Sequence, residues 1–203
     1  MKQLLLDIQP APPQTLDNFV IGHNAEVLTN IQHLLDGSAD ASFIYCWGPA
    51  GSGKSHLLNA AKNLGAHIAD DVHLLDDEAQ IDLFNTYNQL KANGGKLITA
   101  GLHAPSQMQL RDDLATRLAW GLVYQLQPLS DVEKTEALKN HATERGMRLP
   151  DEVIAYCLRY LRRDLPTLMS VLNALDEWSL TEKKPVTVLM LKKLLQLDLD
   201  SYP

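Results

Sequence analysis

The sequence predicts an α/β core with a shortened parallel sheet, followed by a small all-α domain. Short apolar runs alternate with helical patterns as far as about residue 129, as expected when helices cover a parallel sheet. From residue 130 onward only helical periodicity remains, which indicates a separate helical unit. A glycine-rich loop directly follows the first expected strand and opens the helix after it.

The expected elements follow from hydrophobic periodicity and from the turn residues at their ends. Strands are expected at residues 42–47, 66–69, 96–100 and 121–126. Helices are expected at residues 24–35, 54–64, 77–93, 110–118, 131–145, 150–161, 165–180 and 188–197. Asn24 is expected to cap the first helix, and Ser130 with Glu133 forms a capping box for the fifth. Only one strand fits between Leu64 and Asp70, so we expect four parallel strands.

Composition and charge restrict the class of protein. The chain has 203 residues, 45% of them hydrophobic and 21% charged, an ordinary balance for a globular protein. A formal net charge of -7 argues against direct, sequence-specific DNA binding, because DNA binders neutralise phosphates with basic side chains. Cys46 and Cys157 are far apart and fit two free thiols in a reducing compartment. No apolar run is long enough for a membrane span or a signal peptide, so we expect a cytoplasmic protein.

The glycine-rich loop matches the pattern G-x-x-x-x-G-K-S in full and predicts a binding site for ADP or ATP. Backbone N–H groups of such a loop point at phosphate oxygens, and the N-terminus of the following helix favours negative charge. Lys54 is expected to reach the β and γ phosphates, and the Ser55 hydroxyl to bind Mg²⁺. The alternative is a glycine turn without a ligand. The loop residues are Gly48, Pro49, Ala50, Gly51, Ser52, Gly53, Lys54 and Ser55.

Two acids, Asp70 and Asp71, follow the second expected strand. In phosphate-loop proteins an acid at this place holds Mg²⁺, and a neighbouring acid orients the attacking water. We therefore expect Asp70 to contribute to the magnesium site and both acids to belong to the catalytic centre. A solvated loop or a helix cap is the alternative interpretation.

Three further segments carry a resemblance to one family. Residues 16–24 are similar to the segment before the phosphate loop in the bacterial replication initiator DnaA, and residues 114–122 to the arginine-finger box of the same proteins. Residues 124–131 are more similar to the Hda branch, the regulatory inactivators of DnaA. The resemblance to the DnaA/Hda family of P-loop AAA+ proteins extends over residues 16–197.

This resemblance implies an AAA+ nucleotide-binding core over residues 16–129 and a helical lid over residues 130–203. It makes Arg117 an arginine finger, which stabilises charge on the γ-phosphate bound by a different subunit, here DnaA. An ordinary arginine on a surface helix is the alternative. A homodimer is a further possible assembly. The residues that the resemblance places beside the nucleotide are Val20, Ile21, Gly22 and His56.

Residues 1–8 form an apolar tip that resembles the peptide with which bacterial proteins bind the sliding clamp, the β subunit of DNA polymerase III. An extended peptide with a polar anchor and alternating apolar anchors suits a groove. The proline-rich linker at residues 9–15 favours an extended chain that lets the tip reach such a partner. An edge strand packed on the protein's own core is the alternative. The anchors are Gln3, Leu4, Leu6 and Ile8.

Two positions depart from the family pattern. Gly101 stands where the family has a polar side chain that senses the γ-phosphate. Pro166 stands where the lid offers an arginine to the nucleotide, although a proline suits the first turn of a helix. These departures argue against ATP hydrolysis by the chain itself and leave its nucleotide binding as the expectation. We expect no counterpart of the DNA-binding helix-turn-helix domain of DnaA.

The resemblance and the motifs together imply a negative regulator of the initiation of chromosomal replication. It is expected to bind the sliding clamp and to stimulate hydrolysis of DnaA-bound ATP through Arg117, so it activates a partner's hydrolysis more than it turns over ATP itself. One alternative is a stand-alone AAA+ ATPase of the helicase-loader type. The other is a non-catalytic adaptor that binds ADP and the clamp.

Overall fold

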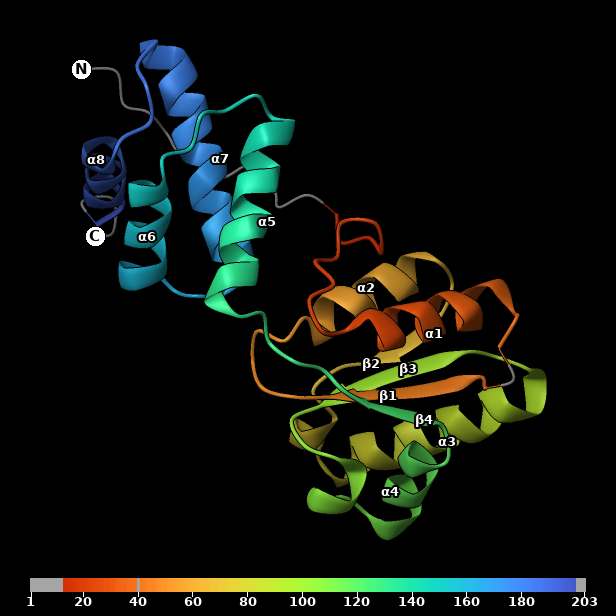
Figure 1. Cartoon of the computed structure of the whole chain (residues 1–203). Helices are drawn as coiled ribbons and strands as arrows, with labels where there is room; N and C mark the ends of the chain where they lie inside the picture. Colours follow the sequence, from red (N-terminus) through yellow and green to blue (C-terminus); the bar gives the residue numbers. More distant parts are fainter. Residues whose placement is uncertain (1–12, 40, 200–203) are drawn as a thin grey trace. The chain divides into compact units, whose positions relative to one another are not determined.

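The computed structural model describes residues 13–39 and 41–199, and these divide into two units. The first unit is Pro13–Leu129 and contains the whole sheet, whereas the second begins at Ser130 and is helical (Figure 1). The expected clamp-binding tip at residues 1–8 and the first part of the linker lie outside the described residues.

The sheet of the first unit has four parallel strands in the order β2-β3-β1-β4, which confirms the expected shortened sheet. The strands are β1 Phe43–Trp47, β2 His67–Ala69, β3 Leu97–Gly101 and β4 Leu122–Gln125. β1 and β3 end level with each other, because Trp47 is opposite Gly101. Since all strands run the same way, the loops at their carboxyl ends gather at one edge, where α/β proteins bind ligands.

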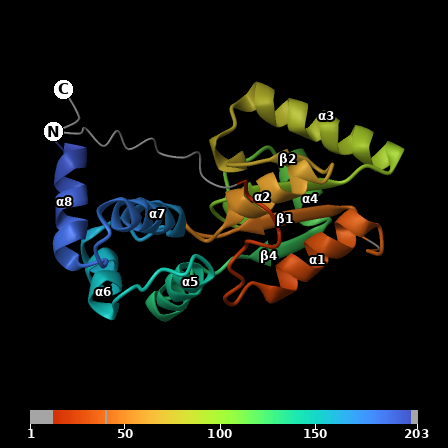
Figure 2. The same cartoon turned by 90° about the horizontal axis from the view of Figure 1, so that it is seen from above.

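Helices cover both faces of this sheet. On one face lie α1 (Ala25–Asp36) and α2 (Lys54–Asn63), and on the other α3 (Asp77–Asn93) and α4 (Asp112–Ala119), as Figure 1 shows from the side and Figure 2 from above. Successive side chains of β1 alternate between the two layers. Ile44 and Cys46 pack in the cluster beneath α1 and α2, and Tyr45 packs in the cluster beneath α3 and α4. Burial on both faces explains why this strand is apolar along its length.

Two short 3-10 helices are not predicted by the periodicity. They are η1 (Val72–Leu74), which follows β2, and η2 (Pro105–Gln107), which follows β3. A single turn of three residues is too short to display a hydrophobic period. Val72 is nonetheless fully buried, so η1 closes the loop after β2 onto the core.

The second unit has its own apolar core, which confirms the expected all-helical domain. Its helices are α5 (Asp131–Glu144), α6 (Asp151–Tyr160), α7 (Leu165–Glu182) and α8 (Val188–Leu199). Each helix contributes at least one buried side chain to a single cluster, among them Leu138, Ile154, Leu175 and Leu191. A segment with a core of its own can behave as a separate body.

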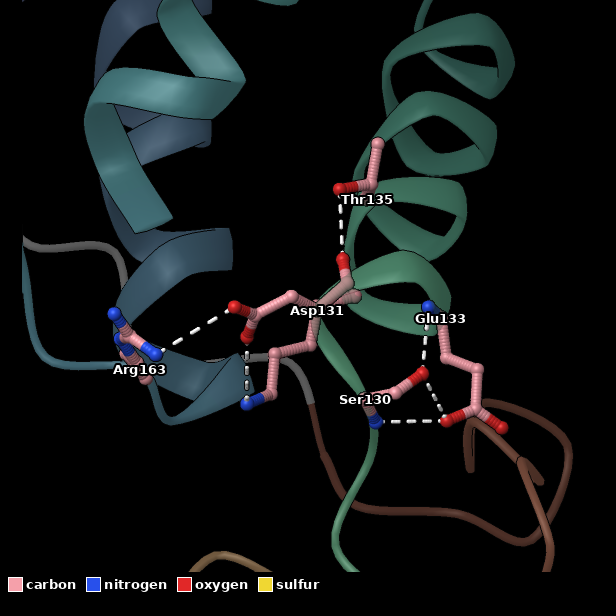
Figure 3. Close-up of polar contacts among 6 residues, drawn as sticks. Ser130, Asp131, Glu133, Thr135 and Arg163 are labelled. Atoms are coloured by element: carbon pink, nitrogen blue, oxygen red, sulfur yellow. Dashed lines mark hydrogen bonds and ion pairs between the residues drawn. The ribbon is translucent and has the colours of Figure 1, made fainter. Parts of the chain in front are cut away.

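The expected capping box at the start of α5 is confirmed (Figure 3). Ser130 Oγ accepts a hydrogen bond from Glu133 N at 3.2 Å, and Glu133 Oε2 accepts one from Ser130 N at 2.7 Å. In the same turn, a carboxylate oxygen of Asp131 lies 3.5 Å from the guanidinium of Arg163, which precedes α7. The first turn of α5 is therefore held both by its own cap and by a neighbouring loop of the helical unit.

Asn24 does not cap α1 with its side chain, so this expectation is wrong. The side chain is 4% exposed and binds the backbone of Gln127, two residues after β4. Nδ2 of Asn24 donates to Gln127 O at 2.9 Å, and Oδ1 accepts from Gln127 N at 2.8 Å. Asparagine side chains often form hydrogen bonds with nearby backbone groups, but the side chain of Asn24 bonds to the backbone of Gln127, which is far away in sequence. The start of α1 is thereby tied to the exit of β4.

The described residues offer neither a reactive thiol nor a membrane-spanning helix. Cys46 and Cys157 are buried and unpaired, as expected. Burial raises the pKa of Cys46 to about 12 and the pKa of Cys157 to about 11, so neither forms a thiolate near neutral pH. Among the helices of residues 13–39 and 41–199, none is both long and apolar enough to cross a bilayer.

Replacing Asn24 with alanine is expected to lower the free energy of unfolding by about 1–3 kcal/mol, because the part-buried N–H and C=O of Gln127 lose their partners. Urea unfolding followed by circular dichroism measures this loss. Thr29→Ala is the control, since the Thr29 hydroxyl bonds only to Ala25 O within α1 and its side chain is exposed. A loss for Asn24→Ala no larger than for the control contradicts the assigned role.

Candidate functional site

The glycine-rich loop connects the end of β1 to the start of α2, at the carboxyl edge of the sheet. Three of its glycines have positive φ, with values of 150° at Gly48, 78° at Gly51 and 93° at Gly53. Residues with a Cβ rarely adopt such angles. Gly53 is the N-cap of α2, so the first N–H groups of this helix point toward the loop. The loop therefore surrounds a helix N-terminus, where anions bind favourably.

Two of these glycines also lie too close to their neighbours to carry a side chain. A Cβ on Gly48 would collide with the backbone oxygen of Leu126, the residue after β4. A Cβ on Gly53 would lie 2.7 Å from Cε2 of Phe19, a buried ring in the segment before α1. The loop is thus closely packed between the exit of β4 and the segment that precedes α1.

Lys54 is largely buried, with 9% of its surface exposed. Its Nζ donates to Gly48 O at 2.7 Å and to Pro49 O at 3.0 Å. Burial lowers the pKa of this ammonium, and the nearby carboxylates of Asp70 and Asp71 act in the opposite direction. Because an ammonium has three N–H donors, one donor remains for an anion held by the loop.

Ser52 supplies a second group that fits a phosphate. Its Oγ is buried and has no hydrogen-bond partner among the described residues. A buried hydroxyl without a partner costs about 1–3 kcal/mol, and a phosphate oxygen in the loop would remove that cost. Ser55 is exposed at the start of α2, where its hydroxyl suits a cation bound to the phosphates. The donors of this loop therefore fit a nucleoside diphosphate or triphosphate.

Asp70 and Asp71 follow β2 at the same edge of the sheet. Oδ1 of Asp70 accepts a hydrogen bond from Asp71 N at 2.9 Å, and Asp71 has a left-handed backbone with φ 48°. Their influence on the pKa of Lys54 means that both carboxylates lie within electrostatic range of the loop. No group of three or more His, Cys, Asp or Glu among the described residues could hold a metal alone. A Mg²⁺ ion would therefore share Ser55 and Asp70 with phosphate and water oxygens, the ligands it prefers.

The segment before α1 lies against α2. His56 Nε2 is 2.8 Å from Thr15 O, and the His56 ring meets the edge of Phe19 at a centroid separation of 5.4 Å. The ring of His56 thus holds this segment in place. Residues 20–22 follow directly, the first half-buried and the other two exposed, so they are the part of the segment open to a ligand.

Gly101, at the end of β3, lies beside the side chain of Tyr45. A Cβ on Gly101 would collide with the Tyr45 hydroxyl and lie 3.2 Å from Sδ of Met108. The hydroxyl donates to His103 O at 2.7 Å, and burial raises the pKa of Tyr45. The missing polar side chain at position 101 therefore has a local physical reason, because Tyr45 fills the space.

Pro166 lies in the first turn of α7, as the sequence predicts for a proline that starts a helix. Asp164 is the N-cap of this helix. The two arginines before it are engaged within the helical unit: Arg162 Nε lies 3.3 Å from Asp164, and Arg163 pairs with Asp131. Neither the proline nor its neighbours supplies an unpaired guanidinium.

Arg117 lies in the last turn of α4, away from the carboxyl edge of the sheet. The chain then passes Trp120 and Gly121, and a Cβ on Gly121 would collide with the carbonyl oxygen of Phe43, the first residue of β1. Trp120 is 58% exposed, although an apolar ring of this size would suit a core position. The structure thus gathers the loop and both acids at one edge and keeps Arg117 at the other.

Three aromatic rings surround the Arg117 guanidinium. Its carbon Cζ lies 4.3 Å from the ring centroid of Trp120, 5.7 Å from that of Phe84 and 6.0 Å from that of Tyr87. Arg117 Nε is buried and has no hydrogen-bond partner among the described residues. Periodicity marks Phe84 and Tyr87 only as the apolar face of a helix, so the sequence does not reveal this contact.

Two family models match the chain. Residues 131–195, in the helical unit, match the model described as the lid domain of Hda. Residues 63–125, in the first unit, match the model of the bacterial DnaA ATPase domain. The second match begins after the glycine-rich loop, so the chemistry of that loop is an independent observation.

Several solved structures have similar folds. Domain III of the replication initiation protein DnaA from Thermotoga maritima is similar with a TM-score of 0.73 and 20% identity, over 91% of this chain and 96% of that chain. DnaA from Aquifex aeolicus bound to AMPPCP gives a TM-score of 0.66 and 22% identity, over 80% and 65%. A variant of RuvB from Thermotoga maritima gives 0.64 and 15%, over 91% and 72%. At these identities the likeness establishes the fold alone, an α/β core with a parallel sheet followed by a helical domain.

Replacing Gly48 with alanine is expected to lower the free energy of unfolding by roughly 2–3 kcal/mol, because the added Cβ meets a backbone oxygen that cannot rotate away. Gly51→Ala is the matched control: it has positive φ in the same loop, but no atom lies within 4 Å of the added Cβ. Its cost is expected to be about 1 kcal/mol, the strain of the backbone alone. Urea unfolding compares the two variants. Equal losses would mean that the approach of Leu126 to the loop has no energetic consequence.

Proposed function

Because the chain belongs to the DnaA-related AAA+ proteins and carries a lid of the Hda type, we propose that it is a negative regulator of the initiation of chromosomal replication. It acts in the cytoplasm, where it binds the sliding clamp of DNA polymerase III and meets ATP-bound DnaA. Arg117 then completes the hydrolytic site on DnaA. The product is ADP-bound DnaA, which no longer starts replication.

The position of Arg117 carries this proposal. Arg117 and Phe43 line the same small cavity, and Phe43 is the first residue of β1. The phosphate loop begins at Gly48, after the last residue of β1, so five steps of extended chain separate the two ends by about 16 Å. An arginine side chain does not span that distance. Arg117 therefore acts on a triphosphate only when another chain brings one.

The chemistry of phosphoryl transfer explains what such an arginine contributes. Negative charge develops on the oxygens of the transferred group, and a planar guanidinium stabilises it with two parallel N–H donors. Two features of Arg117 support this role. No acceptor or carboxylate among the described residues neutralises its side chain, and the residue is half-buried and not enclosed.

We propose that the chain's own ADP or ATP, with Mg²⁺, is a structural ligand. Lys54, Ser52 and the backbone N–H groups of the loop hold its phosphates, and Ser55 with Asp70 faces the cation. Gly101 has no side chain and Pro166 has no cationic group, so neither position offers a donor to a γ-phosphate. Hydrolysis at this site is therefore slow compared with hydrolysis on the partner.

The tip at residues 1–8 supplies the tether to the clamp. Its apolar anchors Leu4, Leu6 and Ile8 alternate as an extended peptide requires, Gln3 is its polar anchor, and the prolines at residues 9–15 extend the connection. Tethering two proteins to one clamp converts their encounter into an intramolecular event and raises its effective concentration. The tip thus brings Arg117 to DnaA only where a clamp is on DNA.

Arg117→Ala is expected to abolish the stimulated hydrolysis of DnaA-bound ATP, a loss of about a thousandfold or more in rate with clamp loaded on DNA. Single-turnover assays with labelled ATP on DnaA measure this. Affinity of the chain for ADP is expected to stay unchanged, because Arg117 is remote from the loop. Arg159→Ala is the control, an arginine of the helical unit that contacts the Tyr160 ring.

Other outcomes of the single-turnover assay would contradict this function or favour an alternative one. Full stimulation by Arg117→Ala contradicts the role of this residue. Rapid ATP turnover by the chain in the absence of DnaA favours the stand-alone ATPase of the helicase-loader type, and a clamp complex without any hydrolysis favours the non-catalytic adaptor.

The double change Leu4→Ala with Leu6→Ala is expected to weaken binding to the sliding clamp at least about tenfold, because two apolar anchors leave the groove. Isothermal titration with purified clamp measures the affinity. Leu5→Ala is the matched control, since an alternating peptide directs this side chain away from the groove. If the double variant and the control bind the clamp equally, the tip is not the clamp-binding element.

A further inference from the structure

The rings around Arg117 come from two helices that pack side by side beneath the sheet (Figure 1). Phe84 and Tyr87 belong to α3 and are separated by one turn, and Trp120 follows α4. Trp120 is the nearest ring to the guanidinium, at 4.3 Å. A cation is attracted to a ring face within about 6 Å, and tryptophan is the strongest acceptor, so Trp120 makes the dominant contact of the three.

Aromatic rings, and no ion pair among the described residues, hold the guanidinium of Arg117. A half-buried guanidinium is commonly oriented by a carboxylate, which fixes its plane with two hydrogen bonds. Among the described residues Arg117 has no such partner, and its Nε has no acceptor at all. A carboxylate would cancel the positive charge, whereas the face of a ring fixes the plane and leaves the charge available.

We propose that Trp120 is a positioning residue for Arg117: its indole holds the guanidinium in the orientation in which it meets the partner's γ-phosphate. This inference rests on the proposed function and adds the residue that orients the guanidinium of Arg117. Lys91 contacts the same ring, with Nζ 4.5 Å from the centroid. This second cation strengthens the positive potential that attracts a triphosphate to Arg117.

Because Trp120 is exposed, it could also contact the partner directly, so the test has to distinguish orientation of Arg117 from docking of the partner. A cavity of about 320 Å³ lies beside the ring, with walls that include Lys91, Tyr87 and Gly121. A residue that only lines a docking surface changes the affinity for the partner. A positioning residue changes the rate within the complex, because it acts on the transition state through Arg117.

The test uses the full chain with clamp on DNA and ATP-bound DnaA. Trp120→Ala is expected to lower the single-turnover rate constant at saturation about tenfold, the value of a partly desolvated cation–ring contact. The half-saturating concentration is expected to stay within about twofold. Trp120→Phe keeps a ring over Arg117 and is expected to retain most of the rate. In an Arg117→Ala background, Trp120→Ala is expected to have no further effect.

Tyr160→Ala is the matched control. Tyr160 is also an exposed aromatic residue, 60% accessible, with an arginine carbon 5.4 Å from its centroid, but it lies on α6 of the helical unit. Its removal is expected to leave the rate unchanged. Circular dichroism and thermal melting verify that each variant is folded.

The outcomes separate this inference from the function on which it rests. If the unmodified chain stimulates hydrolysis and Arg117→Ala does not, but Trp120→Ala is fully active, the inference alone is wrong. A weaker half-saturating concentration with an unchanged rate constant also overturns it, since Trp120 is then a docking residue. If the unmodified chain fails to stimulate hydrolysis, both the proposed function and the inference are wrong.

Discussion

The length of β1 constrains everything else in the first unit. This strand is five residues long, pairs with β3 on one side and β4 on the other, and has Ile44, Tyr45 and Cys46 buried to 1% exposure or less. A strand that is hydrogen-bonded on both edges and packed on both faces cannot shift along its axis without breaking the whole core. Its carboxyl end carries the phosphate loop, and its amino end lies beside the Arg117 segment. The distance between the phosphate loop and Arg117 is therefore fixed by the sheet.

The two cations at the ends of this strand are stabilised in different ways. Lys54 is buried. Two carbonyl acceptors of its own loop and the charges of Asp70 and Asp71, which follow β2, compensate for the lost solvent. Such a cation is held ready for phosphates bound at the same place. Arg117 has rings in place of acceptors, and among the described residues no carboxylate neutralises it. A charge left uncompensated within its own fold is suited to an anion that arrives from outside.

Local patterns predict most of the fold. The strands and the eight helices of the described chain lie where periodicity and turn residues indicate, with ends that move by a residue or two, as at Asp112, where α4 begins. The phosphate loop is predictable because Gly48, Gly53 and Lys54 belong to one contiguous pattern, whereas the packing of Gly48 against Leu126 and of Gly53 against Phe19 is not. The capping box at Ser130 is likewise a local device, and it is present.

Contacts between distant parts of the chain are what the sequence does not reveal. Asn24 directly precedes α1, yet its side chain forms two hydrogen bonds with the backbone of Gln127 and none with the start of the helix. Trp120 is apolar enough to suggest a core position, but its ring stays exposed over Arg117. Gln127 is brought close to Asn24 only by the folded sheet. Arg117 is three residues from Trp120, but the rings of Phe84 and Tyr87 that share its guanidinium come from α3 and reach it only in the folded unit.

Gly101 and Pro166, the two departures from the family pattern, each have a physical explanation in the structure. Tyr45 occupies the space over Gly101, and Pro166 starts α7 behind the Asp164 cap, so each change is accommodated by local packing. Neither change removes a donor from the phosphate loop, whose backbone groups suit the α and β phosphates and whose Lys54 suits the β and γ phosphates. A site that offers nothing more to the γ-phosphate at those two positions has fewer contacts with which to distinguish ATP from ADP. In the function that we propose, the nucleotide of this chain stabilises the fold, and the discrimination between ATP and ADP is left to the partner on which Arg117 acts.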